Sequence, residues 1–132
     1  LFNFLIGKED MHLKNFSLIT RDNKVELAPA YDYLSSVVAY LAVGSRPEDI
    51  EEIALSLKGK KRKLTRRNWI DYFGAERLLL PPKVVDNVLR ELSQARRAWI
   101  SRIDESFLPV AQKELYAELV AERFARLSIP MT

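Results

Sequence analysis

The chain has 132 residues, 48% of them hydrophobic and 30% charged, a balance typical of one soluble globular domain rather than a disordered segment. It contains no cysteine and a single histidine, which excludes disulfides and argues against a zinc site built from these residues. The longest mostly apolar window, residues 33–43, is too short to cross a bilayer, so we expect no membrane contact. The absence of cysteine makes the cytoplasm the expected location.

The first residues, LFNFLIG, indicate the last turns of a buried helix, with Gly7 at the position that favours a left-handed end. The chain opens on this apolar run without a methionine or a polar approach, whereas N-termini are usually polar and loosely held. We therefore expect a segment of a longer protein that starts inside an element that is already buried.

A polar loop, DMHLKN at residues 10–15, separates this helix from two predicted strands. The strands are expected at Phe16–Thr20 and Lys24–Leu27, joined by the turn-forming residues 21–23. Pro29 then ends the pairing, because it has no N–H to donate to a ladder.

A short helix is expected over residues 33–43. The sequence SRPE at residues 45–48 has the spacing of a capping box and predicts a helical turn that starts near residue 46. Alternating apolar residues at 53–57 and a tight turn at 58–60 favour a hairpin with residues 62–64 over a helix that continues through residue 57.

The second half of the chain predicts three helices. Thr65 can cap a helix that runs to about Phe73, and Gly74 can end it. Pro81 and Pro82 stand where a helix begins, because proline is tolerated in the first turn.

That longest helix carries apolar residues at helical spacing from Val84 to Phe107, and Pro109 separates it from a final helix over residues 111–124. The predicted fold class is therefore mainly α (α+β): one domain, residues 1–132, with a helical body and a small β-hairpin near the N-terminus.

Asp10 and Asn15 lie five residues apart, the interval between the catalytic aspartate and the magnesium-binding asparagine in the H-R-D-L-x-x-x-N loop of protein kinases. Phosphoryl transfer needs a carboxylate that orients the attacking hydroxyl and oxygen ligands for magnesium. Asp32, in APAYDY, follows the predicted hairpin, where a kinase has the aspartate of D-F-G. This order of acid, amide, hairpin and acid is more specific than any of its members.

Three segments carry a resemblance to a known family: IGKEDMHLKNFSL, LAPAYDYLSS and LSLKGKKRKLTRRNW. They resemble the C-terminal half of HipA-type kinases, the toxin components of bacterial toxin–antitoxin pairs. The resemblance covers nearly the whole chain, and its D-x-H-x-K-N-F-S run, which begins at Asp10, is highly specific. It implies a serine/threonine protein kinase, with ATP and magnesium as cofactors and a protein-kinase-like C-terminal lobe made mostly of helices.

By position, the resemblance implies that Asp10 is the catalytic base, Asn15 a magnesium ligand and Asp32 the counterpart of the D-F-G aspartate, with His12 and Lys14 as further catalytic-loop residues. Known members phosphorylate aminoacyl-tRNA synthetases and are restrained by a DNA-binding HipB-type antitoxin. We therefore expect a protein substrate, such an antitoxin, and DNA through the antitoxin complex as partners.

The family's N-terminal lobe, with its phosphate-covering loop and ATP-contacting lysine, would lie before Leu1. We expect this lobe to be a required partner and the chain alone to be inactive.

Simpler roles compete for each of these residues. Asp10 could cap a turn, Asn15 could supply a left-handed loop residue, and Asp32, ahead of YLSSVV, is a good helix N-cap. The ring of His12 can bridge backbone groups and hold Asp10 in place. Lys14 either neutralises charge on a transferred phosphoryl group or faces solvent.

Residues 58–67, KGKKRKLTRR, form a basic tract without an acid. Since the whole chain has 21 basic and 18 acidic residues, this tract carries the excess positive charge. It either binds phosphate-rich partners, namely ATP, tRNA on a synthetase or operator DNA, or is a solvated hairpin tip. Its basic members are Lys58, Lys60, Lys61, Arg62, Lys63, Arg66 and Arg67.

Two functions compete with the intact kinase. One is a non-enzymatic module that docks DNA or a protein through the basic tract. The other is one lobe of a split kinase, which works only with an N-terminal lobe on a separate chain. A Gly-rich loop and a strand lysine encoded before Leu1 would favour the intact enzyme.

Overall fold

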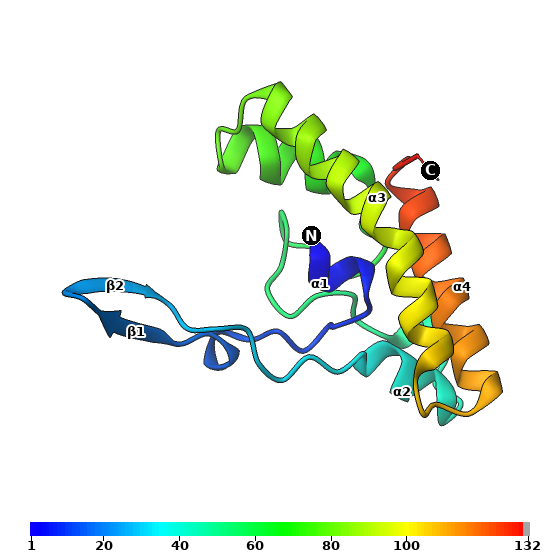
Figure 1. Cartoon of the computed structure of the whole chain (residues 1–132). Helices are drawn as coiled ribbons and strands as arrows, with labels where there is room; N and C mark the ends of the chain where they lie inside the picture. The colour runs from blue at the N-terminus through cyan, green and yellow to red at the C-terminus, as the bar shows by residue number, and fades with distance from the viewer. Residues whose placement is uncertain (131–132) are drawn as a thin grey trace.

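The computed structural model describes residues 1–130, and Figure 1 shows a helical body from which one hairpin projects. Within these residues the sheet is a single antiparallel pair of strands, so the predicted class, mainly α with a small hairpin near the N-terminus, is confirmed. The elements in chain order are α1 (Phe2–Leu5), η1 (Leu13–Asn15), β1 (Leu18–Arg21), β2 (Lys24–Leu27), α2 (Ser36–Ala42), η2 (Pro47–Asp49), η3 (Arg67–Arg77), α3 (Pro82–Glu105) and α4 (Val110–Arg126).

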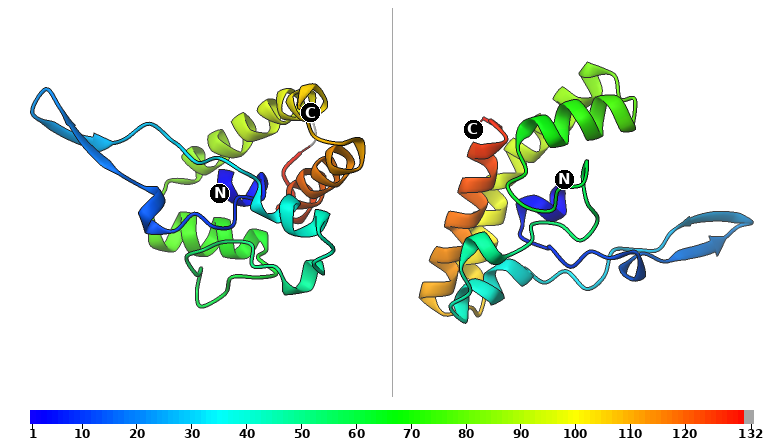
Figure 2. Two further views of the ribbon diagram at one scale, coloured as in Figure 1. Left: turned by 90° about the horizontal axis from the view of Figure 1, so that it is seen from below. Right: turned by 180° about the vertical axis from the view of Figure 1, so that it is seen from behind.

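The core lies where α1 and η3 meet the pair formed by α3 and α4, which lie side by side in all three views (Figures 1 and 2). Phe4 of α1 is fully buried, and its ring centroid lies 5.3 Å from that of Trp69 on η3. From α4, Phe124 is also fully buried and packs edge-on against Trp99 of α3. Each such side chain contributes about 1.5–3 kcal/mol of hydrophobic stabilisation, so α1 is held firmly at the centre of the helices.

The N-terminal predictions are largely confirmed, except that β1 starts at Leu18 instead of Phe16 and includes Arg21, which was predicted to lie in the turn. Helix α1 ends at Leu5, and Gly7 has the expected left-handed backbone, with φ of 72°. In the hairpin, Leu18 pairs with Leu27 and Arg21 with Lys24. The connecting residues, Asp22 and Asn23, both have positive φ, as a two-residue hairpin turn that matches strand twist requires.

Helix α2 begins at Ser36 with Ser35 as its N-cap, so the prediction of a helix from residue 33 was wrong at its start. The alternative role of Asp32 as the N-cap was wrong for the same reason. Asp32 has φ of 56°, a left-handed backbone conformation that does not lead directly into a right-handed helix. Three further residues separate it from the first helical position, Ser36.

The end predicted for the next helix was also wrong. Helix η3, which has π-type geometry, runs through Gly74 to Arg77 instead of stopping near residue 73. Gly74 is buried, and a Cβ at this position would lie 3.8 Å from Cγ2 of Val85 in α3. This is an ordinary van der Waals distance, so Gly74 is a helical residue where a side chain could also fit, and the left-handed residue that follows the helix is Leu79. The helix starts where the sequence predicts: Arg66 already has helical backbone angles, and the carbonyl of Thr65 accepts the N–H groups of Asn68 at 3.0 Å and Trp69 at 3.2 Å.

Residues 53–64 form neither the predicted hairpin nor a helix. One antiparallel bridge joins Leu57 to Lys60 around the expected tight turn. Ile53 and Ala54 are consecutive and both buried, which differs from the alternation expected of a hairpin with one face in solvent. The predicted helical turn near residue 46 is present as η2.

The last two helices match their predictions, because α3 begins at Pro82 and α4 follows Pro109. Phe107 is an exception: α3 ends at Glu105, and Phe107 is fully exposed beyond it. Within residues 1–130, no helix combines the length and apolar character needed to cross a bilayer.

Candidate functional site

The segment that enters the polar loop is fixed to the start of α2. The carbonyl oxygen of Gly7 accepts a hydrogen bond of 3.0 Å from the backbone N–H of Val37, and the N–H of Glu9 donates to Oγ of Ser36 at 3.1 Å. Because α2 follows the hairpin and α1 precedes it, these bonds bring the two ends of the hairpin segment together.

Lys8 connects two of the predicted site residues. Its side chain is only 1% exposed, and Nζ lies 2.7 Å from Oδ1 of Asp10 and 3.4 Å from Oδ2 of Asp32. The carboxylates themselves stay open to solvent, with side-chain exposures of 42% and 57%. The structure therefore brings Asp10 and Asp32, which lie on either side of the hairpin, to one buried ammonium group.

Asn15 lies at the end of η1 and belongs to the same cluster. Its Nδ2 donates a hydrogen bond of 2.9 Å to the backbone oxygen of Asp10. The amide nitrogen is thus directed at the protein, and Oδ1 is the atom left for a cation. Two carboxylates and an amide oxygen form an all-oxygen donor set, which suits magnesium.

His12 and Lys14 both have exposed side chains, and both contribute to the loop through their main chains. The N–H of His12 donates to the oxygen of Asp10 at 2.8 Å, and its carbonyl accepts from the N–H of Asn15 at 2.9 Å. The carbonyl of Lys14 accepts a 3.3 Å hydrogen bond from the hydroxyl of Tyr31. Backbone groups therefore fix the main chain of the loop at Asp10, whereas its carboxylate is held by Lys8.

The electrostatics of the cluster depend on Lys8. Burial acts to lower the pKa of Lys8, but hydrogen bonding and charge from Asp10, together with the charge of Asp32, outweigh it and raise the pKa above its ordinary value. Lys8 is thus a permanent cation at neutral pH.

The neighbouring Glu9 is buried, and its negative charge and hydrogen bond raise the pKa of Tyr40. Glu9 is therefore a second buried charge beside Lys8, and it interacts with Tyr40 of α2.

Sequence reasoning did not single out Lys8, Ser36 or Gly7 as parts of the site. The signal available was position alone, because Lys8 directly follows a left-handed glycine and precedes the polar loop. A lysine is almost never fully buried unless it is paired, and that pairing depends on tertiary contacts.

The basic tract is partly engaged with the protein itself. Lys61 forms an ion pair of 3.0 Å with Glu51, and Arg66 donates to the carbonyl of Leu127 at 2.7 Å. Arg62 donates to the Glu48 carbonyl. Lys58 lies over the aromatic ring of Tyr72. The remaining basic residues of the tract are exposed, and within residues 1–130 they form no ion pair: Lys60, Lys63 and Arg67.

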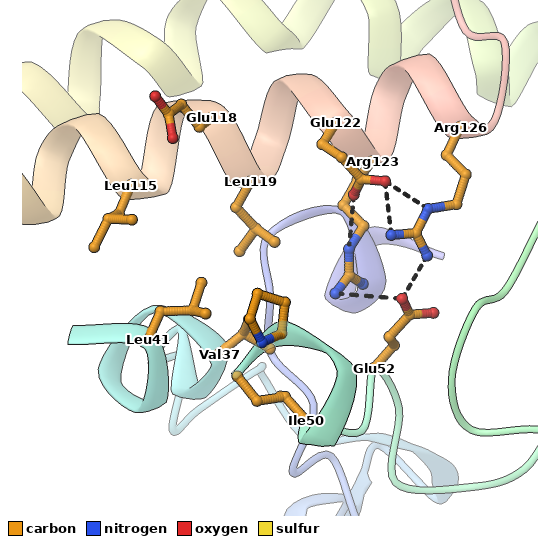
Figure 3. A pocket seen from close by; sticks show the side chains of 11 residues that line it. Val37, Leu41, Ile50, Glu52, Leu115, Glu118, Leu119, Glu122, Arg123 and Arg126 are labelled. Atoms are coloured by element: carbon orange, nitrogen blue, oxygen red, sulfur yellow. Dashed lines mark hydrogen bonds and ion pairs between the residues drawn. The ribbon is translucent and has the colours of Figure 1, made fainter. Parts of the chain in front are cut away.

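Figure 3 shows a separate pocket of about 540 Å³ between α2, η2 and α4. Apolar side chains line one part of it, and an ion-pair network closes the other. In that network Arg123 is 3% exposed and donates to the carbonyl of Phe4 at 3.2 Å, while Glu52 pairs with both Arg123 and Arg126.

Burial lowers the pKa of Arg123 to about 10, against the raising effect of Glu52. Glu52 also accepts the N–H of Leu64 at 2.8 Å, so the network ties the basic tract to α4. None of the lining side chains belongs to the polar loop, so the pocket is not part of the candidate site.

Within the described part of the chain, no three His, Cys, Asp or Glu side chains cluster in a way that could hold a metal by themselves. A cation at the candidate site would therefore need the amide of Asn15 besides Asp10 and Asp32, or oxygens brought by a nucleotide.

Comparison with known proteins identifies the class. A family model described as the HipA-like C-terminal domain matches residues 1–99, which include the polar loop, Asp32 and the basic tract. The chain belongs to this family, and the resemblance drawn from the sequence is confirmed.

A curated relative from Sinorhizobium fredii (strain NBRC 101917 / NGR234), named "Putative kinase Y4dM", is 32% identical over 114 residues. The match covers 86% of this chain and 26% of the relative, so the chain spans about a quarter of that relative's length.

Proposed function

We propose that this chain is the C-terminal catalytic lobe of a HipA-like serine/threonine protein kinase, which transfers a phosphoryl group from ATP to a protein such as an aminoacyl-tRNA synthetase. The observation that carries the proposal is the meeting of Asp10 and Asp32 at one ammonium group, with Asn15 bonded to the backbone of Asp10. Membership in the HipA-like family and the name of the S. fredii relative support it.

Asp10 is proposed to orient the substrate hydroxyl and accept its proton. Its partly exposed carboxylate is accessible to a hydroxyl group, and the loop fixes its main chain through His12 and Asn15. In kinases the corresponding aspartate does the same work. Lys14, exposed in the same loop, would contribute positive charge near the transferred group.

Asn15 and Asp32 are proposed to hold magnesium. The oxygen donors fit that ion, and the open faces of the carboxylates leave room for it. When bound with ATP, magnesium would neutralise charge on the phosphates.

An N-terminal lobe would cover the nucleotide from the other side, because phosphoryl transfer relies on contacts preorganised around the whole nucleotide. We propose that lobe as a required partner, and a HipB-like DNA-binding antitoxin as the regulator.

The test is a phosphorylation assay on the full-length protein with an aminoacyl-tRNA synthetase as substrate and Asp10→Asn as the variant. Loss of the carboxylate should lower turnover by about 10²–10⁴-fold, while ATP binding survives. Asp86→Asn, an exposed aspartate of α3, is the matched control and should leave turnover unchanged. Near-normal turnover in Asp10→Asn would refute the proposed role.

A second candidate function is docking of DNA or another polyanion through the basic tract, either by a non-enzymatic module or by one lobe of a split kinase. Lys60, Lys63 and Arg67 favour it, because they are exposed and unpaired within residues 1–130. A protein that binds operator DNA or tRNA but never labels itself or a synthetase with phosphate, even with its N-terminal lobe present, would favour this function over the kinase.

A further inference from the structure

A lysine at the position of Lys8 requires an explanation beyond stability. Its ammonium is nearly inaccessible to water, yet the two carboxylates that it contacts remain about half exposed. The ammonium of Lys8 therefore contacts Asp10 and Asp32 from the protein side, and the solvent side of both carboxylates stays open.

The main chain around Lys8 is fixed by groups from two helices. Its N–H donates to the carbonyl of Asn3 in α1 at 2.8 Å, and the neighbouring Gly7 and Glu9 are bonded to the start of α2. Packing of α1 and α2 thus determines where the ammonium lies, rather than the mobility of a long side chain.

We propose that Lys8 is a positioning residue of this site: a built-in cation that sets the spacing of Asp10 and Asp32 and keeps a divalent cation from binding there tightly until a nucleotide arrives. The proposal rests on the kinase function proposed above. It adds a regulatory property to that function, namely that metal enters with the nucleotide and not before it.

The charges support this order of binding. Asp10 and Asp32 would together present two negative charges to a divalent cation, but Lys8 cancels one of them at contact distance. Kinases commonly place two magnesium ions between such acids and the phosphates. Here the ammonium of Lys8 supplies one positive charge between the two carboxylates. A metal ion then needs the additional negative charge of the polyphosphate to bind tightly.

The experiment measures binding of Mn²⁺ to the full-length, nucleotide-free protein by electron paramagnetic resonance. Lys8→Met keeps the length and burial of the side chain but removes the charge. Because the carboxylates stay solvated, the variant is expected to fold, which circular dichroism checks. Mn²⁺ affinity should rise by about tenfold or more, since a unit positive charge a few Å from a dication repels it.

Two further variants make the result specific. Lys8→Arg keeps the charge and should return the affinity toward that of the wild type. Lys83→Met removes an exposed charge on α3 and should leave Mn²⁺ affinity unchanged.

In phosphorylation assays, Lys8→Met should lower kcat by about 10–100-fold because Asp10 loses its fixed position, with a smaller change in KM for ATP. Equal Mn²⁺ affinity in the wild type and in a folded Lys8→Met variant would overturn the inference about Lys8. Absence of both ATP binding and phosphoryl transfer in the wild type would instead overturn the proposed kinase function, so the two failures are distinguishable.

Discussion

Replacing Gly7 with alanine should destabilise the protein for two separable reasons. Gly7 has φ of 72°, and an alanine Cβ would lie 2.6 Å from Cδ2 of Leu119 and 2.7 Å from Oγ of Ser35. A left-handed backbone costs a non-glycine residue about 1–2 kcal/mol. Overpacking in a filled site adds about 1–3 kcal/mol, so the free energy of unfolding should fall by about 2–5 kcal/mol.

Gly59→Ala is the matched control. Gly59 has φ of 75°, but a Cβ there meets no atom within 4 Å, so this variant carries the backbone cost without the packing cost. The effect of glycine on the unfolded chain is the same for both variants and cancels in their difference.

Urea unfolding followed by the fluorescence of the core residues Trp69 and Trp99 gives both values. Gly7→Ala should be less stable than Gly59→Ala by about 1–3 kcal/mol. Equal destabilisation would refute the close packing of α1, α2 and α4 around the entry to the polar loop.

Two other predictions concern the rest of the chain. Glu52→Gln should lower the free energy of unfolding by about 1.5–3 kcal/mol, because the buried Arg123 loses one of its two carboxylate partners and keeps only Glu122, at 3.6 Å. Arg102→Ala breaks an exposed pair with Glu105 and should cost at most about 1 kcal/mol. Similar losses in both urea titrations would count against the network. Neutralising Lys60, Lys63 and Arg67 should weaken binding to operator DNA or tRNA. On duplex DNA the slope of log affinity against log salt should become shallower by about 0.9 for each phosphate that the variant no longer neutralises. An unchanged slope would indicate that the basic tract is a solvated surface that does not bind phosphates.

Much of the fold follows from local sequence. The Asp22-Asn23 turn between two short β-rich runs predicts its hairpin, and prolines mark the starts of α3 and α4. These features depend on the backbone preferences of a few neighbouring residues.

Other features depend on tertiary contact and could not be predicted in this way. Gly74 resembles a helix end in the sequence, but it lies buried inside η3, next to Val85 of α3. Apolar residues at 53–57 alternate as in a strand, yet the side chain of Glu52 accepts the N–H of Leu64, and both Ile53 and Ala54 are buried. In both segments, contacts with residues distant in the sequence determine the local conformation.

The candidate site also has a part that the sequence predicts and a part that depends on tertiary contacts. The order of Asp10, Asn15 and Asp32 along the chain predicts a shared site, since the hairpin between them can return the chain to its starting point. Lys8 escaped prediction because nothing near it in the sequence shows that α1 and α2 would enclose its ammonium.

The central claim is that Asp10, Asn15 and Asp32 form one magnesium–ATP site, and the magnesium dependence of ATP affinity tests it most directly. Calorimetric titration of the full-length protein should be made at several magnesium concentrations for the wild type, Asp32→Asn, Asn15→Ala and the control Asp86→Asn. Asp32→Asn and Asn15→Ala should bind ATP more weakly and need more magnesium, while the control should match the wild type. Identical magnesium dependence in the wild type and Asp32→Asn would contradict the claim.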